Sequence, residues 1–320
     1  MRIRLAVLII ILIRQIQLFA QELPVYQQYL LNRNLINPAI TGFTGCASFQ
    51  LSDRHQWIGI SDAPNTQSIS AQKGFLSNDN KIHGIGLNLY HDINGAYQQL
   101  GGDFLYAYHF TISRQNNINL SLGLSVSVFQ KLINESDFTP VYDPIINGTR
   151  NNEILPEAGV GILLHNENFF AGLSGIKLLS FIETIQEMER HFYLYSGLAF
   201  NNARSTIIYE PSILLKITES LKKQIDINFK TIFNDKYWLT FSYRNNISKI
   251  PWQSISIISI FGINSGNFSF AYVFDAGLSR IQLYNYGSHE FMIRYEICPS
   301  KSRDLDCPTY KGLMKRYRTR

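Results

Sequence analysis

The sequence predicts an all-β fold, a transmembrane antiparallel β-barrel of about 14 strands. Apolar and polar or small residues alternate over most of the chain, as where Leu120, Leu122 and Leu124 are separated by Ser121 and Gly123. The chain is poor in charge, with 17% charged and 13% aromatic residues, against about 25% charged residues in an average soluble domain. Its predicted connections alternate between short turns and longer loops, which is typical of barrels in the bacterial outer membrane.

Residues 1–20 have the pattern of a secretory signal peptide. Arg2 and Arg4 precede nine apolar residues at positions 5–13, and the small residue Ala20 stands before Gln21. We therefore predict cleavage between Ala20 and Gln21 and export of the mature chain. The alternative is a buried strand or helix at the start of a domain. The apolar run is too short for a membrane-spanning helix, which needs about 20 residues.

Residues 21–44 precede the first predicted strand. Pro38 disfavours helical backbone angles at Asn37, so a helix over 26–36 would end there. This segment is either a periplasmic linker or a short helix and turn that plugs the barrel. Because a lumen enclosed by about 14 strands is wide enough to leak, we favour the plug.

Residues 45–297 form the predicted barrel, in which each strand has one apolar and one polar face. The predicted strands span 45–52, 65–75, 82–90, 97–112, 117–130, 156–166, 168–176, 190–202, 205–218, 223–233, 235–245, 252–262, 265–275 and 286–297. Connections after even-numbered strands are short, and most of those after odd-numbered strands are longer, with 219–222 as an exception. An even strand count places both ends of the barrel at the rim of short turns, which is the periplasmic rim.

The competing fold is a soluble β-sandwich. So many long strands with so little charge would supply more apolar surface than a sandwich core needs, whereas a barrel in lipid exposes it. A sheet in lipid must also close, because an open edge leaves unpaired backbone groups. Trp57, Trp238 and Trp252 stand near predicted strand ends, where we expect an interfacial aromatic belt.

Several short motifs follow one another in a fixed order. The N-terminal group contains Tyr29, Asn32, Asn37, Pro38, Ala39 and Gly42. Later positions are Arg54, Trp57, Pro64, Arg190, Asp226, Arg244, His289 and Glu290. In this order and spacing, over residues 22–297, the motifs resemble the PorP/SprF family of type IX secretion membrane proteins. The tail after Cys298 is not part of the resemblance.

The resemblance implies an outer-membrane barrel similar to the long-chain fatty-acid transporter barrel. It also implies an accessory, non-enzymatic role in type IX secretion, in which the barrel contacts cargo such as gliding adhesins and serves their export or surface attachment. The implied partners are secreted cargo or adhesin proteins, other type IX secretion components and outer-membrane lipid. A rival hypothesis is a transporter for hydrophobic small molecules. A weaker one is a structural barrel that anchors periplasmic machinery through its tail.

The strand pattern predicts charged side chains inside the barrel. The positions are Asp226, Lys230, Arg244, Glu290 and Arg294. They form either a functional lumen or a satisfied polar network. The neighbours His91 and Asp92 point to opposite faces of a strand, as do His289 and Glu290, so neither pair makes a catalytic dyad. The seven histidines lack zinc-ligand spacing. We predict no enzymatic activity, no metal and no cofactor.

The longest predicted loop spans residues 131–155. It carries acidic and aromatic side chains at Glu135, Asp137, Tyr142, Asp143 and Glu153. The loop is either merely solvated or a contact site for cargo or an adhesin, because functional contacts concentrate on loops.

The tail of residues 298–320 is predicted to be periplasmic. It carries seven basic and two acidic residues, and the first 20 residues carry three basic and no acidic ones, so the net charge of +5 comes from the chain ends. We therefore predict no nucleic-acid partner. The tail is either a disordered end or a segment that binds an acidic periplasmic partner or an anionic membrane surface. Three cysteines allow a Cys298–Cys307 or a Cys46–Cys298 bridge, and the sequence does not choose between them.

Overall fold

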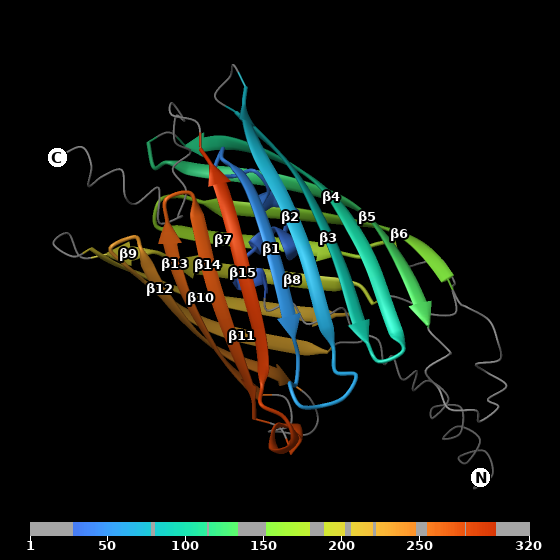
Figure 1. Cartoon of the computed structure of the whole chain (residues 1–320). Helices are drawn as coiled ribbons and strands as arrows, with labels where there is room; N and C mark the ends of the chain where they lie inside the picture. Colours follow the sequence, from blue (N-terminus) through green and yellow to red (C-terminus); the bar gives the residue numbers. More distant parts are fainter. Residues whose placement is uncertain are drawn as a thin grey trace, which may run out of the picture.

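The computed structural model describes residues 28–77, 81–113, 115–133, 152–179, 189–201, 206–219, 222–247, 255–278 and 280–298. These residues form a closed antiparallel β-barrel (Figure 1). The strands are β1 Ala47–His55, β2 Asn65–Leu76, β3 Ile82–Asn94, β4 Tyr97–Ser113, β5 Ile118–Ile133, β6 Asn152–His165, β7 Phe169–Ile176, β8 His191–Leu198, β9 Phe200–Asn201, β10 Ile207–Thr218, β11 Lys223–Phe233, β12 Tyr237–Ile247, β13 Ile255–Ser265, β14 Phe268–Gly277 and β15 Ser288–Ile297.

The barrel closes between its first and last strands. β1 pairs with β15, with Ala47 opposite Ile297 and His55 opposite His289. β8 and β9 flank Ala199 and pair with the same strand, β10, so the 15 segments of the described chain make a 14-strand barrel. The predicted fold class is confirmed, and the two-layer sandwich is excluded because the sheet closes on itself.

The two faces of each strand form the inner and outer surfaces of the barrel wall. In β1, Phe49 and Leu51 are 53% and 54% exposed on the outer face, while Ser52 and Arg54 are buried inside. The same arrangement recurs around the barrel, which therefore has an apolar exterior and a polar interior, as a membrane barrel requires. None of the helices among the described residues has the length and apolar character needed to cross a membrane.

The turns at one rim are short because their residues adopt hairpin geometry. In the three-residue connection between β11 and β12, Asn234 and Asp235 have the left-handed φ angles of 48° and 58°, and the amide of Lys236 closes the turn by donating to the carbonyl of Phe233 at 3.0 Å. The other rim carries most of the longer connections, including 56–64, 177–190 and 278–287. Two connections at that rim are short: the predicted link 219–222 between β10 and β11, and the two-residue turn 95–96 between β3 and β4.

Two sequence expectations need correction. β5 continues to Ile133 and β6 starts at Asn152, so the longest connection is shorter than 131–155, and Glu153 lies in β6 opposite Lys131. Trp238 faces the lumen and is 8% exposed, because it occupies an inward position of β12 rather than the expected outer belt. Trp57 lies just beyond β1, and Trp252 is outside the described residues.

Candidate functional site

The described part of the N-terminal segment, residues 28–46, lies inside the barrel (Figure 1). It forms three one-turn 3-10 helices, η1 Gln28–Leu30, η2 Arg33–Leu35 and η3 Pro38–Ile40. The continuous helix expected over 26–36 is therefore wrong for its described residues. Asn32 interrupts it with φ −138° and ψ 87°, and its side chain donates to Ser70 Oγ of β2 at 2.7 Å.

The Asn37-Pro38-Ala39 motif forms a turn against the inner wall. Asn37 has the extended φ of −145° expected before proline, and its Oδ1 accepts from the amide of Ala39 at 2.9 Å. Its Nδ2 donates to the carbonyl of Ile162 in β6 at 3.0 Å. One asparagine side chain therefore caps η3 and fastens it to the barrel, and Ala39 is fully buried.

Glycines in the wall make room for this turn. A Cβ atom added to Gly123 of β5 would collide with the backbone of Ala39, and one added to Gly161 of β6 would collide with the side chain of Asn37. Glycine weakens a strand unless another backbone approaches closely, and that approach occurs here. Further along, Gly42 has a φ of +69° and packs against Gly84 of β3 in the same way.

Histidines hold the part of the segment that lies nearest the rim of short turns. His109 Nε2 donates to the carbonyl of Thr41 at 2.8 Å, and its Nδ1 lies 2.7 Å from Ser121 Oγ. The ring of Phe43 packs edge-on against His165 with 4.6 Å between ring centres. Because His109 donates to a carbonyl through Nε2, its Nδ1 in the neutral ring is an acceptor for the serine hydroxyl.

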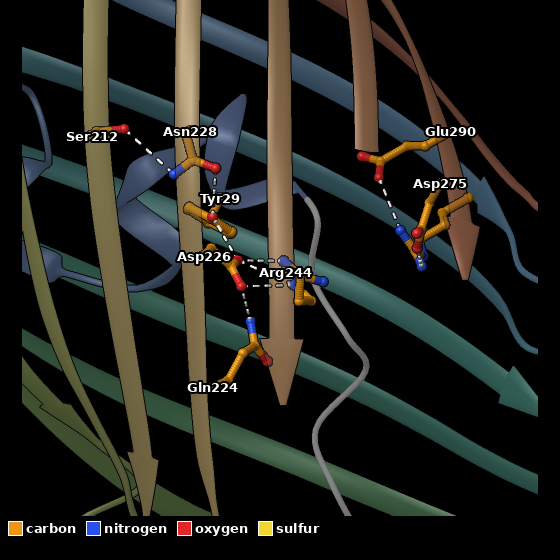
Figure 2. A network of polar contacts seen from close by, with 9 residues as sticks. Tyr29, Ser212, Gln224, Asp226, Asn228, Arg244, Asp275 and Glu290 are labelled. Carbon is orange, nitrogen blue, oxygen red and sulfur yellow. Dashed lines mark hydrogen bonds and ion pairs between the residues drawn. The ribbon is translucent and has the colours of Figure 1, made fainter. Parts of the chain in front are cut away.

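Tyr29 joins the N-terminal segment to a buried ion pair in the barrel wall (Figure 2). Its hydroxyl donates to Asp226 of β11 at 2.7 Å, and Arg244 of β12 donates to the same carboxylate at 2.7, 3.0 and 3.1 Å. Asn228 and Gln224 complete the network around them. Burial and the charge of Asp226 raise the pKa of Tyr29 well above its usual value, so the hydroxyl stays a donor at neutral pH.

A second ion cluster lies across β1, β14 and β15. Arg54 is 3.5 Å from Asp275 and 3.7 Å from Glu290, and Ser52 donates to Glu290 at 2.8 Å. The predicted inward positions Asp226, Arg244 and Glu290 thus fall into two separate clusters, each with its own counter-charge.

The remaining family-motif positions lie toward the rim of longer connections. Trp57 follows β1 with a φ of 47°, and its amide lies 3.3 Å from Ser288 Oγ. The carbonyl of Pro64 accepts from the amide of Gln56 at 2.9 Å. Arg190 is 3.4 Å from Glu219. His289 faces outward, and its Nδ1 lies 2.6 Å from the hydroxyl of Tyr272. Its neighbour Glu290 is buried inside the barrel.

Several predicted positions lie outside the described residues. They are Ala20 and Gln21 of the expected cleavage site, the loop residues Glu135, Asp137, Tyr142 and Asp143, and Cys307 in the tail. Of the two cysteine pairings that the sequence leaves open, the structure contains Cys46–Cys298, which links the start of β1 to the end of β15.

Sequence reasoning missed several residues that hold the segment. Arg33 of η2 forms an ion pair with Glu210 of β10 and lies over the ring of Phe170 at 4.9 Å. His109 and Glu210 occupy polar-face positions in the alternation, and that signal could have placed them in the lumen. Among the described residues, no group of three or more His, Cys, Asp or Glu is arranged to hold a metal ion.

The family model for the type IX secretion system membrane protein PorP/SprF matches residues 18–295. The chain belongs to the PorP/SprF family. This is a family of secretion-system membrane barrels, so the family and outer-membrane location expected from the sequence are confirmed.

Comparison with solved structures finds distant similarities. A triple mutant of Rh. blastica porin aligns with a TM-score of 0.38 and 8% identity, covering 79% of this chain and 99% of the porin. CdiB from Acinetobacter baumannii aligns with a TM-score of 0.40 and 10% identity, covering 79% of this chain and 60% of CdiB. No curated protein matches the PorP/SprF chain described here.

Proposed function

We propose that this PorP/SprF protein is an accessory barrel of the type IX secretion system that contacts cargo such as adhesins and is needed for their export or surface attachment. The observation that supports the proposal is the contact of the N-terminal segment with the inner wall, where Tyr29, Arg33 and Asn37 each bond to a different strand. We infer that this segment plugs the lumen. A barrel closed in this way works through its exposed rims and outer wall rather than through its pore.

The partners follow from this arrangement. Family membership supports other type IX secretion components and cargo as protein partners, and the apolar outer wall suits outer-membrane lipid. The longest connection between described strands joins β5 to β6 and contains Glu135, Asp137, Tyr142 and Asp143. We propose this loop as the cargo contact, because loops carried on a rigid scaffold commonly provide binding residues.

The rival transport function has less support. Passage of hydrophobic molecules through the lumen would need a continuous apolar path. The described inward positions instead include the charged groups Asp226, Arg244 and Glu290, whose exposure to an apolar solute would be unfavourable. The tail of residues 298–320 stays a candidate for binding periplasmic machinery. A pull-down from outer membranes with and without the tail tests that role, and unchanged partners would count against it.

The decisive experiment removes the protein and then restores it. Deletion should lower the export or surface display of at least one type IX cargo, and intact export and display of all cargo would refute the proposal. Co-purification and mass spectrometry with the restored chain should recover that cargo.

A triple variant of the loop tests the proposed contact. Replacing Glu135, Asp137 and Asp143 by their amides should reduce recovery of the cargo while leaving barrel assembly intact. The control is Asp235→Asn in the β11–β12 turn at the opposite rim, where asparagine also tolerates the positive φ. Equal cargo recovery with both variants would exclude these carboxylates from the contact.

A further inference from the structure

A cavity of about 150 Å³ lies between the N-terminal segment and the barrel wall. Its lining includes Arg33, Glu210, Lys230, Arg294 and Glu296. Lys230 stands near the end of β11, and Arg294 stands near the end of β15, so the cavity is close to the rim of short turns. That rim faces the periplasm in outer-membrane barrels.

Lys230 differs from the other charged groups of this cavity in its ion pairing. Its direct cross-strand neighbour in the β10–β11 register is Glu210, but Glu210 forms its ion pair with Arg33 of the N-terminal segment. Within the described part of the chain, no carboxylate lies within ion-pair distance of the Lys230 ammonium group. The ammonium instead lies 5.0 Å from the ring centre of Trp238, a contact that favours the cation without neutralising it.

Two further basic side chains, Arg33 and Arg294, line the same cavity as Lys230. Arg294 is held toward the cavity by Gln50, whose Oε1 accepts at 2.7 Å, and by the carbonyl of Leu31. Among the described residues that line this space, three are basic and two are acidic. The N-terminal segment contributes one of the basic residues, Arg33, which also occupies Glu210.

We propose that this cavity binds one small monoanion, a carboxylate or a phosphate group, between Lys230, Arg33 and Arg294. Ammonium and guanidinium groups make strong charge-assisted hydrogen bonds to such oxygens. The volume of 150 Å³ is about that of five water molecules at ~30 Å³ each, so it suits inorganic phosphate, acetate or the C-terminal carboxylate of a peptide rather than a folded partner. The site lies beyond the cargo-contact role proposed above and does not depend on it.

The test uses the purified full-length barrel in detergent, titrated calorimetrically at constant chloride and ionic strength. Sodium phosphate and sodium acetate test the free anions, and a tripeptide with a free or an amidated C-terminus tests the peptide source. Each titration is repeated with Lys230→Met. The control is Lys236→Gln, because Lys236 also lies over an aromatic ring, that of Tyr237 at 5.2 Å, but in an exposed turn.

The native barrel and Lys236→Gln should bind at least one of these anions saturably and with equal affinity. Lys230→Met should bind it at least about tenfold more weakly. Because the methionine removes a cation without leaving an unpaired carboxylate, the variant should fold. Binding to the native barrel should also change the fluorescence of Trp238, and Trp238→Phe should remove that change while retaining calorimetric binding. The proposal is overturned if the native barrel binds none of the anions, if Lys230→Met binds equally well, or if fluorescence does not respond to a bound anion.

Discussion

Replacing Asp226 by Asn perturbs the ion pair with the most hydrogen bonds among the described residues. The Asp226 carboxylate accepts three hydrogen bonds from Arg244 and one from Tyr29, and also one from Gln224 at 2.9 Å. The Asp226 and Arg244 side chains are 0% and 2% exposed, so water cannot replace a lost partner. The substitution keeps the size of the side chain and removes its charge.

The expected loss follows from the burial of the arginine. Removing one partner of a buried ion pair leaves an uncompensated charge and costs about 3–5 kcal/mol. Tyr29→Phe removes a single hydrogen bond to a charged group and should cost about 1.5–3 kcal/mol. Combining Asp226→Asn with Arg244→Met should cost less than Asp226→Asn alone, because the unpaired cation is then gone.

The assay is reversible urea unfolding of the barrel in lipid vesicles, followed by tryptophan fluorescence and by the change of gel mobility on heating. Each variant is compared with the native chain by its free energy of unfolding. The reasoning is refuted if Asp226→Asn costs no more than Tyr29→Phe, or if adding Arg244→Met increases the loss.

Three further outcomes follow from the structure. Gly123→Ala should displace the Asn37-Pro38-Ala39 turn and raise single-barrel conductance in planar bilayers, whereas Gly102→Ala on the outer face should not. Unchanged conductance in both variants would contradict the close packing of Ala39 against Gly123. Cys46→Ser should cost about 2–5 kcal/mol of unfolding free energy and abolish the mobility change on reduction, while Cys307→Ser retains that change. Burial, with Lys131 nearby, lowers the pKa of Lys177 to about 7. The unfolded lysine keeps its proton to higher pH, so the free energy of unfolding should rise between about pH 7 and pH 10 by up to ~1.4 kcal/mol per unit, and Lys177→Met should flatten that rise.

The alternation of residue types was enough to predict the barrel wall. Whether a side chain faces lipid or lumen depends on its odd or even position in a strand, which is a local property of the backbone. His289 and Glu290 could therefore be assigned to opposite faces. Trp238 faces the lumen because it occupies the polar face of β12, although it stands near a strand end.

The course of the N-terminal segment could not be derived from periodicity, because its short 3-10 turns repeat no pattern over residues 28–46. Its partners lie far away in sequence: Tyr29 bonds to Asp226, and Arg33 pairs with Glu210. The glycine at position 123 is unremarkable in the sequence until the backbone of Ala39 is seen against it.

The sequence by itself therefore determined the strands, their two faces and the closed sheet, since each depends on neighbouring residues and on the need to pair every strand edge in lipid. Only the tertiary structure decided which inward charges meet, that Cys46 reaches Cys298, and that Arg33 occupies the carboxylate opposite Lys230. Those outcomes depend on barrel register and on the path of a segment through the lumen, and both bring together residues that no local pattern connects.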